Sequence, residues 1–190
     1  MARASTGDDK NTLVEALRRF KCCKDLDVQG FLNHKAIDFE IRGWATTYLL
    51  LSRERFDSGD LFVEGYFALT HKAVIFDSKV SLSSRKKIAG TKTAETESFV
   101  LIGQLGKRIG CTSDGTTVCS SLTAVDLLND AMSIIEQSSN YIISRNVIVE
   151  CKPIEKIKQI YEHYGFADLQ YDEQEALHTL YLRVENKITF

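Results

Sequence analysis

The stretch Asn146-Val-Ile-Val-Glu-Cys151, followed closely by Ile160-Tyr-Glu-His-Tyr-Gly-Phe166, decides the fold of this chain. The first run is apolar and rich in β-branched residues, which favours a strand. Apolar side chains then recur at helical spacing at Ile154, Ile157, Ile160, Tyr161 and Tyr164. Gly165 follows at the position where a left-handed backbone ends a helix. The stretch therefore predicts a strand and then a helix that stops at Gly165.

The segments on either side continue the same alternation. Residues 98–104 form a nearly continuous apolar run, which is typical of a buried strand. Thr123 and Asp126 have the spacing of a capping box, which predicts a helix from there to about residue 139. Residues 177–184 predict a last strand. This β-α-β-α-β order implies parallel pairing with right-handed crossovers.

The N-terminal half predicts two helices and then an antiparallel hairpin. Helical spacing of apolar residues covers 11–20 and 28–41. The hairpin strands are expected over 46–52 and 63–76, with a turn at Gly59.

The two polar segments over residues 81–97 and 109–118 are expected to be loops. The fold class is then α/β, a mixed and mostly antiparallel central sheet with flanking helices and a parallel β-α-β core. We expect a disordered tail over 1–10 and a single domain over 11–190.

Composition limits the partners and the compartment. The chain has 190 residues, a net charge of −2 and 44 % apolar residues, so it has no bulk electrostatic attraction for nucleic acid or anionic membrane. It has five cysteines and no Cys-x-x-Cys pair, which indicates reduced thiols in a cytoplasmic protein. A polar start without an apolar core predicts no signal peptide, and no apolar run is long enough for a membrane span. The histidines and cysteines form no ligand motif, so we expect no metal.

The closing motif Tyr161-Glu-His-Tyr-Gly165-Phe166 resembles the Tyr-x-x-x-Gly-Phe helix end of the GNAT (general-control-type N-acetyltransferase) superfamily. The strand Gly65-Tyr-Phe-Ala-Leu69 is similar to the third strand of that family. In element order the resemblance extends over about residues 28–185. It implies a divergent bacterial member with a GNAT-like fold, acyltransferase activity and acetyl-CoA as the acyl donor.

By this resemblance Tyr161 is the candidate acid that protonates the leaving thiolate, because a phenol stays protonated at neutral pH. Tyr161 would alternatively only pack in the helix stripe, and Tyr164 is a weaker candidate on the same face. Glu150 ends a strand and would orient or deprotonate the incoming amine, unless it is simply a solvated carboxylate. Glu64 is a further candidate for the acceptor cleft.

The pyrophosphate of coenzyme A needs backbone N–H groups and a helix N-terminus. The residues expected to hold the cofactor are Ile102, Gln104, Leu105, Gly106, Lys107, Arg108, Ser120 and Ser121. The sequence departs from the family here: an insertion over 109–118 replaces the glycine pair of the phosphate loop. Ile154 also stands where the family often has an asparagine. Ordinary capping of a surface helix is the alternative interpretation of Ser120 and Ser121.

Three functions are therefore open. The first is an N-acetyltransferase with an unidentified small-molecule or peptide amine acceptor. The second is a toxin that acetylates aminoacyl-tRNA, because the segment from Phe20 to Leu32, with Thr47-Tyr48 and Gly65-Tyr66, looks like bacterial GNAT toxins. That activity needs a basic surface, for which Arg85-Lys-Lys87 is a candidate. The third is a non-catalytic module that binds coenzyme A or a partner.

Overall fold

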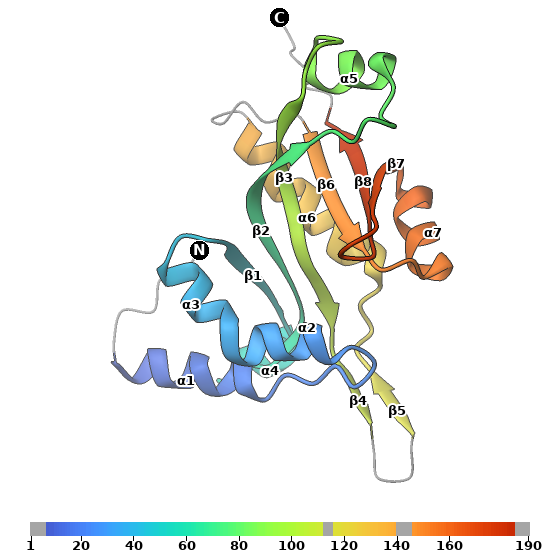
Figure 1. Cartoon of the computed structure of the whole chain (residues 1–190). Helices are drawn as coiled ribbons and strands as arrows, with labels where there is room; N and C mark the ends of the chain where they lie inside the picture. Colours follow the sequence, from blue (N-terminus) through green and yellow to red (C-terminus); the bar gives the residue numbers. More distant parts are fainter. Residues whose placement is uncertain (1–6, 112–115, 140–145, 185–190) are drawn as a thin grey trace, which may run out of the picture. The chain divides into compact units, whose positions relative to one another are not determined.

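The computed structural model describes residues 7–111, 116–139 and 146–184 (Figure 1). The chain divides into two units. Unit 1 comprises Met1–Ala68 and Gln104–Leu127, and unit 2 comprises Leu69–Gly103 and Leu128–Phe190. Strands β2 and β3 each run through both units.

The central sheet has six strands in the order β1-β2-β3-β6-β8-β7. The strands are β1 (Thr46–Leu51), β2 (Val63–Ile75), β3 (Thr96–Lys107), β6 (Asn146–Cys151), β7 (Ala167–Asp172) and β8 (Leu177–Arg183). Strands β3 and β6 are parallel, with Val100 opposite Val147. Strand β8 is antiparallel to both β6 and β7. The mixed sheet with a parallel centre confirms the expected fold class.

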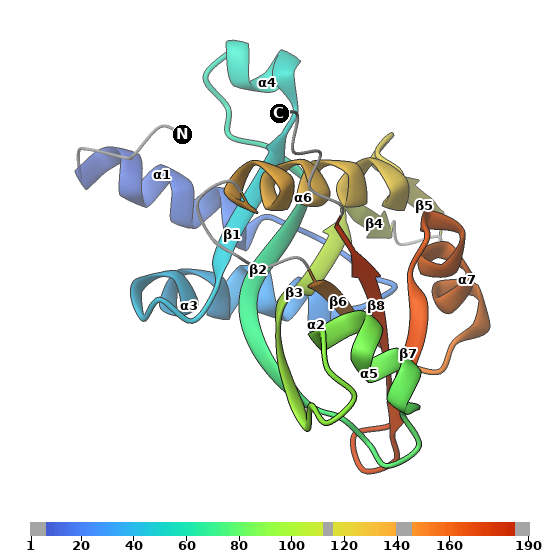
Figure 2. The same ribbon diagram turned by 90° about the horizontal axis from the view of Figure 1, so that it is seen from above.

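Strand β7 was missing from the sequence prediction, and its presence corrects the pairing of the last strand. Residues 167–172 have no continuous apolar run, but Ala167, Leu169 and Tyr171 alternate with polar residues, a pattern that indicates a strand. The chain enters β7 at the sheet edge after helix α7 (Glu155–Tyr164) and returns as β8, which lies between β6 and β7. Because a hairpin reverses direction, β8 runs antiparallel to β6, not parallel. Both views show α7 beside β7 (Figures 1 and 2).

The helical half of unit 1 follows the sequence closely. Its helical segments are α1 (Gly7–Arg18), α2 (Leu26–Gly30), the π-helical turn η1 (Phe31–Lys35), α3 (Ala36–Ile41) and the short α4 (Arg53–Asp57). Helix α1 begins inside the expected tail, of which residues 1–6 lie outside the described residues. The Asp25 carboxylate caps α2 by accepting from the amides of Asp27 and Val28. Tyr66 is fully buried and packs edge-to-face on Phe20.

Helices α7 and α6 match the expectations from the sequence, and α5 corrects one. Helix α7 ends at Gly165, which has φ 112°, as predicted. Helix α6 (Ala124–Ser139), which starts in unit 1, begins at the expected capping box. The expected loop 81–97 instead contains helix α5 (Leu82–Ala89), capped by the Ser81 hydroxyl. Only Ile88 of α5 is buried, so the sequence carried no apolar stripe that would have indicated a helix.

The expected loop 109–118 forms a hairpin of β4 (Ile109–Cys111) and β5 (Thr117–Cys119), and residues 112–115 lie outside the described residues. Cys23 and Cys111 form a disulfide, so the prediction of reduced thiols alone was wrong for this pair. The two cysteines are 88 residues apart, and sequence spacing cannot reveal such a pair.

No helix in the described part of the chain is long and apolar enough to cross a membrane. The described residues also contain no group of three or more His, Cys, Asp or Glu placed to hold a metal ion.

Candidate active site

Tyr161 lies in α7, in unit 2, with its side chain partly buried. Its ring meets Phe166 edge-on, with 5.8 Å between the ring centres. Burial, and secondarily the nearby Cys151, raises the pKa of Tyr161 to about 12. Among the described residues the Tyr161 hydroxyl has no hydrogen-bond partner. It is therefore a protonated donor that the rest of the described fold does not use.

Tyr164 is used differently, although it lies in the same helix. Its hydroxyl donates to the Asn129 Oδ1 of α6 at 2.9 Å. Burial, and secondarily Glu136, raises its pKa above the usual value for a tyrosine. The two tyrosines are thus distinguished by one hydrogen bond that the sequence could not reveal.

Glu150 ends β6 in unit 2, as expected, but it has a partner. Both of its carboxylate oxygens accept from the Lys72 ammonium of β2, at 2.7 and 2.8 Å. The pair is partly exposed, with 44 % of the Lys72 side chain and 21 % of the Glu150 side chain accessible. An amine that approached Glu150 would have to compete with Lys72. Sequence reasoning missed Lys72, because only the sheet brings β2 residues to the end of β6.

The start of α6 is held by its own side chains. The Asp126 amide donates to the Thr123 hydroxyl at 3.1 Å, and the Asp126 carboxylate accepts from the Thr123 amide at 2.7 Å. The Thr123 amide and the Thr123 hydroxyl both donate to the Asp126 carboxylate, each at 2.7 Å, and these two hydrogen bonds lower the pKa of Asp126. The Ser120 hydroxyl accepts from the Leu122 amide at 3.2 Å. Three of the amides near this N-terminus, those of Leu122, Thr123 and Asp126, are therefore already occupied.

Lys107 and Gly106 also have structural roles in unit 1. The Lys107 ammonium donates to the carbonyl oxygens of Leu122 at 2.7 Å and Ser120 at 3.5 Å, and so it holds the segment before α6. At Gly106 an added Cβ would lie 2.2 Å from a Val28 methyl. Only glycine allows β3 and α2 to approach this closely.

Gln104 and Leu105 complete the β3 part of the candidate site. The Tyr66 hydroxyl donates to the Val28 carbonyl oxygen at 2.6 Å and lies 3.5 Å from the Gln104 Oε1. Leu105 is partly buried, and Ile102 is buried in the unit 2 part of β3.

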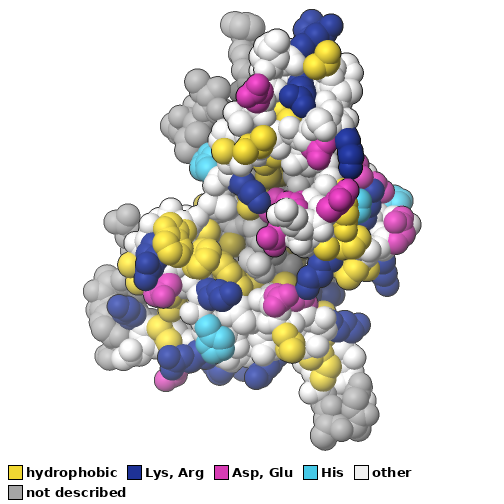
Figure 3. All heavy atoms as spheres, viewed as in Figure 1, with side chains coloured by type: hydrophobic (Ala, Val, Ile, Leu, Met, Phe, Trp, Pro, Cys, Tyr) yellow, Lys and Arg dark blue, Asp and Glu magenta, His cyan; other side chains and the backbone are white. Residues whose placement is uncertain are grey.

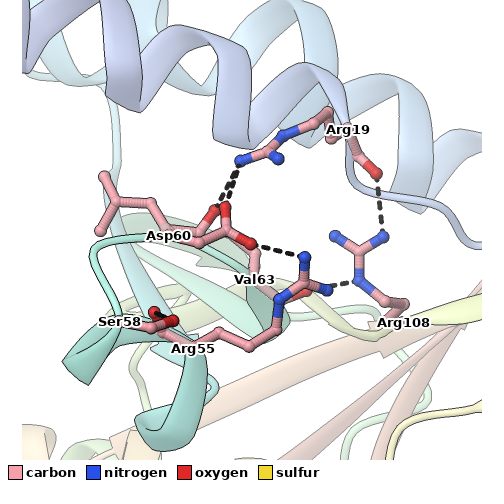
Figure 4. Close-up of polar contacts among 7 residues, drawn as sticks. Arg19, Arg55, Ser58, Asp60, Val63 and Arg108 are labelled. Atoms are coloured by element: carbon pink, nitrogen blue, oxygen red, sulfur yellow. Dashed lines mark hydrogen bonds and ion pairs between the residues drawn. The ribbon is translucent and has the colours of Figure 1, made fainter.

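Arg108 fastens three segments of unit 1 together (Figure 4). Its Nε donates to the Val63 carbonyl oxygen at 2.7 Å and its Nη1 to the Arg19 carbonyl oxygen at 2.9 Å. The guanidinium lies over the rings of Phe62 and Phe20, 4.1 and 5.4 Å from their centres. Burial lowers its pKa from the usual arginine value. Arg108 is thus a structural cation as well as a candidate countercharge.

An ion-pair network lies beside it. The Asp60 carboxylate accepts from Arg19 at 2.9 Å and pairs with Arg55 at 2.5 Å, and hydrogen bonding to Arg19 first, then to Arg55, lowers the pKa of Asp60. Figure 4 shows this network next to Arg108.

Ser121 and Glu64 line a common cavity of about 430 Å³ in unit 1. The other lining residues are Leu50, Leu51, Ser52, Arg53 and Leu122. Sequence reasoning named both residues but did not place them together. The predicted site residues in unit 2 are Ile102, Glu150, Ile154, Tyr161 and Tyr164, whereas Glu64, the segment from Gln104 to Arg108, Ser120 and Ser121 belong to unit 1.

Comparison with known proteins gives a fold match without a sequence match. No protein-family model matches the chain, and no curated protein matches it. A solved structure of AtaT complexed with acetyl-methionyl-tRNAfMet is similar, with a TM-score of 0.64 and 20 % identity over 88 % of this chain and 86 % of that one. AtaTR bound with AcCoA gives a TM-score of 0.62 and 21 % identity over 88 % and 86 %.

A variant of KacT gives a TM-score of 0.61 and 20 % identity over 85 % of this chain and 84 % of that one. At these identities the likeness establishes the fold alone. The chain therefore has, over most of its length, the GNAT fold of the AtaT and KacT proteins.

Proposed function

We propose that this chain is an acetyl-CoA-dependent N-acetyltransferase of the toxin type, whose acceptor is the amino group of an aminoacyl-tRNA. The observation that carries the proposal is the fold likeness over 88 % of the chain to AtaT in complex with acetyl-methionyl-tRNAfMet. The likeness to AtaTR with AcCoA supports the choice of acyl donor. The segment from Phe20 to Leu32, which resembles GNAT toxins, supports the same acceptor.

The residues present offer a site for acetyl-CoA, which supplies the acyl group as a thioester. We propose that its phosphates are held by the segment from Gln104 to Arg108 and by Ser120 and Ser121. Ser121 lines the cavity of about 430 Å³, and Lys107 already fixes the carbonyl oxygens of this segment. Ile154 precedes α7 without a side-chain cap and is 48 % exposed. An apolar side chain there would contact the cofactor arm in place of a hydrogen bond.

We assign the proton donor to Tyr161. Acyl transfer leaves a thiolate, which is protonated more readily when a neutral acid lies beside it. The pKa of Tyr161, raised to about 12, keeps its hydroxyl protonated across physiological pH. We do not assign the amine to Glu150, because Lys72 occupies both of its carboxylate oxygens.

The net charge of the chain is −2, but part of the surface of unit 1 carries exposed cations that suit a nucleic-acid acceptor. Within the described residues, several exposed cations of unit 1 have no ion-pair partner: Arg18, Lys21, Lys24 and Lys35. Figure 3 shows Lys and Arg side chains over α1 and its surroundings. In the expected patch of unit 2, Arg85 donates to the carbonyl oxygens of its own loop. Only Lys86 and Lys87 of that patch remain exposed for a phosphate backbone.

The direct test is transfer of radiolabelled acetyl from acetyl-CoA to a set of charged tRNAs. Deacylated tRNA and tRNA charged with an N-blocked amino acid are the matched controls, because they share the RNA and lack the free amine. We expect label only on tRNA with a free aminoacyl group, and growth arrest when the chain is expressed. If small amines were acetylated and no charged tRNA took up label, the acceptor would be a small amine and not an aminoacyl-tRNA.

The non-catalytic alternative is tested by thermal melting with acetyl-CoA. Ligand at 100 times its dissociation constant should stabilise the protein by about 2.7 kcal/mol. No shift at millimolar acetyl-CoA would contradict an acetyltransferase of any acceptor class.

A further inference from the structure

Four of the five cysteines lie at one short ribbon of unit 1. Strand β4 pairs with β5 on one side and with the segment around Cys22 on the other. The Ile109 amide donates to the Lys21 carbonyl oxygen at 2.8 Å, and the Cys23 amide donates to the Ile109 carbonyl oxygen at 3.0 Å. The Cys23–Cys111 disulfide joins the segment around Cys22 to strand β4.

The hairpin joins the two halves of the proposed phosphate-binding segment. Arg108 precedes β4 and Ser120 follows β5, and the Ser120 amide donates to the Arg108 carbonyl oxygen at 2.9 Å. Lys107 holds the Leu122 carbonyl oxygen on the same side. A displacement of the hairpin would therefore be passed to Lys107, Ser120 and Ser121.

Beyond Ile109, the described residues of the hairpin are only lightly packed. Strands β4 and β5 have three residues each, and all three residues of β5 are exposed. Two-stranded hairpins this short are marginal in water without further packing. At the start of β4, Ile109 is held by its two hydrogen bonds to the Lys21–Cys23 segment and by packing on the unit 1 core. The covalent link from Cys111 to Cys23 adds an attachment at the other end of β4.

The disulfide is also accessible to a reductant, because Cys111 is exposed. Among the three other cysteines, Cys22 and Cys151 are buried and Cys119 is exposed. Cys119 is a diagonal neighbour of Cys111 in the hairpin register. It carries the same functional group on the same hairpin without the cross-link, and so it provides a matched control.

We propose that the Cys23–Cys111 pair is a reversible thiol–disulfide site that controls the phosphate-binding segment. In the oxidised form the disulfide holds the β4–β5 hairpin as described. A dithiol reductant attacks one sulfur of the pair, a mixed disulfide forms, and the other cysteine leaves as a thiolate and takes up a proton. The second thiol of the reductant then displaces the remaining cysteine, so that two electrons and two protons pass from the dithiol to the pair.

Reduction releases the hairpin and weakens the binding of acetyl-CoA. The release of the hairpin follows from the ribbon alone. The effect on acetyl-CoA rests on the proposed function, and the experiment separates the two.

Hydrogen exchange of the 109–111 and 117–119 amides, followed by mass spectrometry, reports on the hairpin without any ligand. With dithiothreitol, we expect exchange there to accelerate by about tenfold or more in the wild-type chain. Cys23→Ser should exchange rapidly with or without dithiothreitol, and Cys119→Ser should behave as the wild type. Unchanged exchange after reduction, verified by thiol alkylation of Cys23 and Cys111, would overturn the proposal, as would a pair that dithiothreitol does not reduce in the folded protein.

The dissociation constant of acetyl-CoA is then measured in both redox states. We expect the dissociation constant to rise by about fivefold or more on reduction. Part of the binding free energy must then be spent on ordering the released hairpin. Equal affinity in both states would overturn the control of the cofactor site. If neither state binds acetyl-CoA, the proposed function fails, and the thiol–disulfide site is judged by the exchange result alone.

Discussion

The Lys72 ammonium lies within 2.8 Å of both carboxylate oxygens of Glu150. This contact joins β2 to β6 within unit 2 and places a cation on the carboxylate that the sequence offers as a base. A partly exposed ion pair of this kind contributes about 0–1 kcal/mol to folding. Its main consequence is therefore chemical, because it occupies the lone pairs that an incoming amine would use.

We expect Glu150→Gln to change turnover by less than about threefold, since a carboxylate already engaged by Lys72 contributes little proton transfer. Steady-state kinetics with a fixed acceptor checks this. Lys72→Met is the companion variant, and it should leave kcat similarly unchanged. A loss of about a hundredfold in Glu150→Gln alone would return Glu150 to the role of base.

Tyr161→Phe should lower kcat by about 10²- to 10⁴-fold, because it removes the proposed proton donor. Its stability in urea should stay close to that of the wild type, since no described residue bonds the hydroxyl.

Tyr164→Phe is the matched control. It loses the hydrogen bond to Asn129, so we expect it to cost about 0.5–1.5 kcal/mol of stability and to leave kcat within about twofold. If Tyr164→Phe proved the inactive variant, the assignment of the two tyrosines would be reversed.

Alkaline pH should destabilise the protein through Tyr161. Its pKa is raised to about 12 in the folded chain, against about 10 in an unfolded chain. Between these values the unfolded state has lost the proton and the folded state has kept it, so stability falls as pH rises. Below about pH 10 both states keep the proton, and the loss of stability grows as the pH rises from about 10 towards about 12. Urea unfolding from pH 8 to 11 should therefore show a shallower decline in Tyr161→Phe, and parallel curves would contradict the raised pKa.

Gly106→Ala should destabilise unit 1 by about 1–3 kcal/mol, because its new methyl group would lie 2.2 Å from a Val28 methyl. Val28→Ala removes the opposing methyl group. The double variant should therefore be more stable than the sum of the single effects predicts, and denaturant unfolding of all four proteins measures this coupling. Additive effects would show that the two residues do not meet.

Arg108→Lys should lower stability by about 1–3 kcal/mol although it preserves the charge, because an ammonium cannot replace the planar guanidinium that bonds two carbonyl oxygens between aromatic rings. Thermal melting checks this. Arg53→Lys is a control, since the Arg53 side chain is 95 % exposed. A variant with wild-type stability and weaker acetyl-CoA binding would instead make Arg108 mainly a cofactor residue.

The elements with strong local signals were predictable from the sequence. Strand β6 was found at its observed bounds because it centres on the β-branched run Val147-Ile-Val149, and the end of α7 was found because Gly165 has a positive φ. The capping box was also predictable, because Thr123 and Asp126 are only three positions apart in the sequence. Helix α5 was missed because it has no apolar stripe of its own and depends on its Ser81 cap. Strand β7 carried a local signal that the sequence analysis overlooked, because Ala167, Leu169 and Tyr171 alternate with polar residues.

The sequence by itself determined the mixed sheet, the helix that carries Tyr161 and the resemblance to acetyltransferases, since each depends on residues close together in the chain. Only the tertiary structure decided the state of the side chains. It gave Glu150 the partner Lys72, gave Tyr164 the partner Asn129 and joined Cys23 to Cys111. These contacts link residues 35 to 88 positions apart, and they form because strand pairing and helix packing bring together atoms that no local pattern relates.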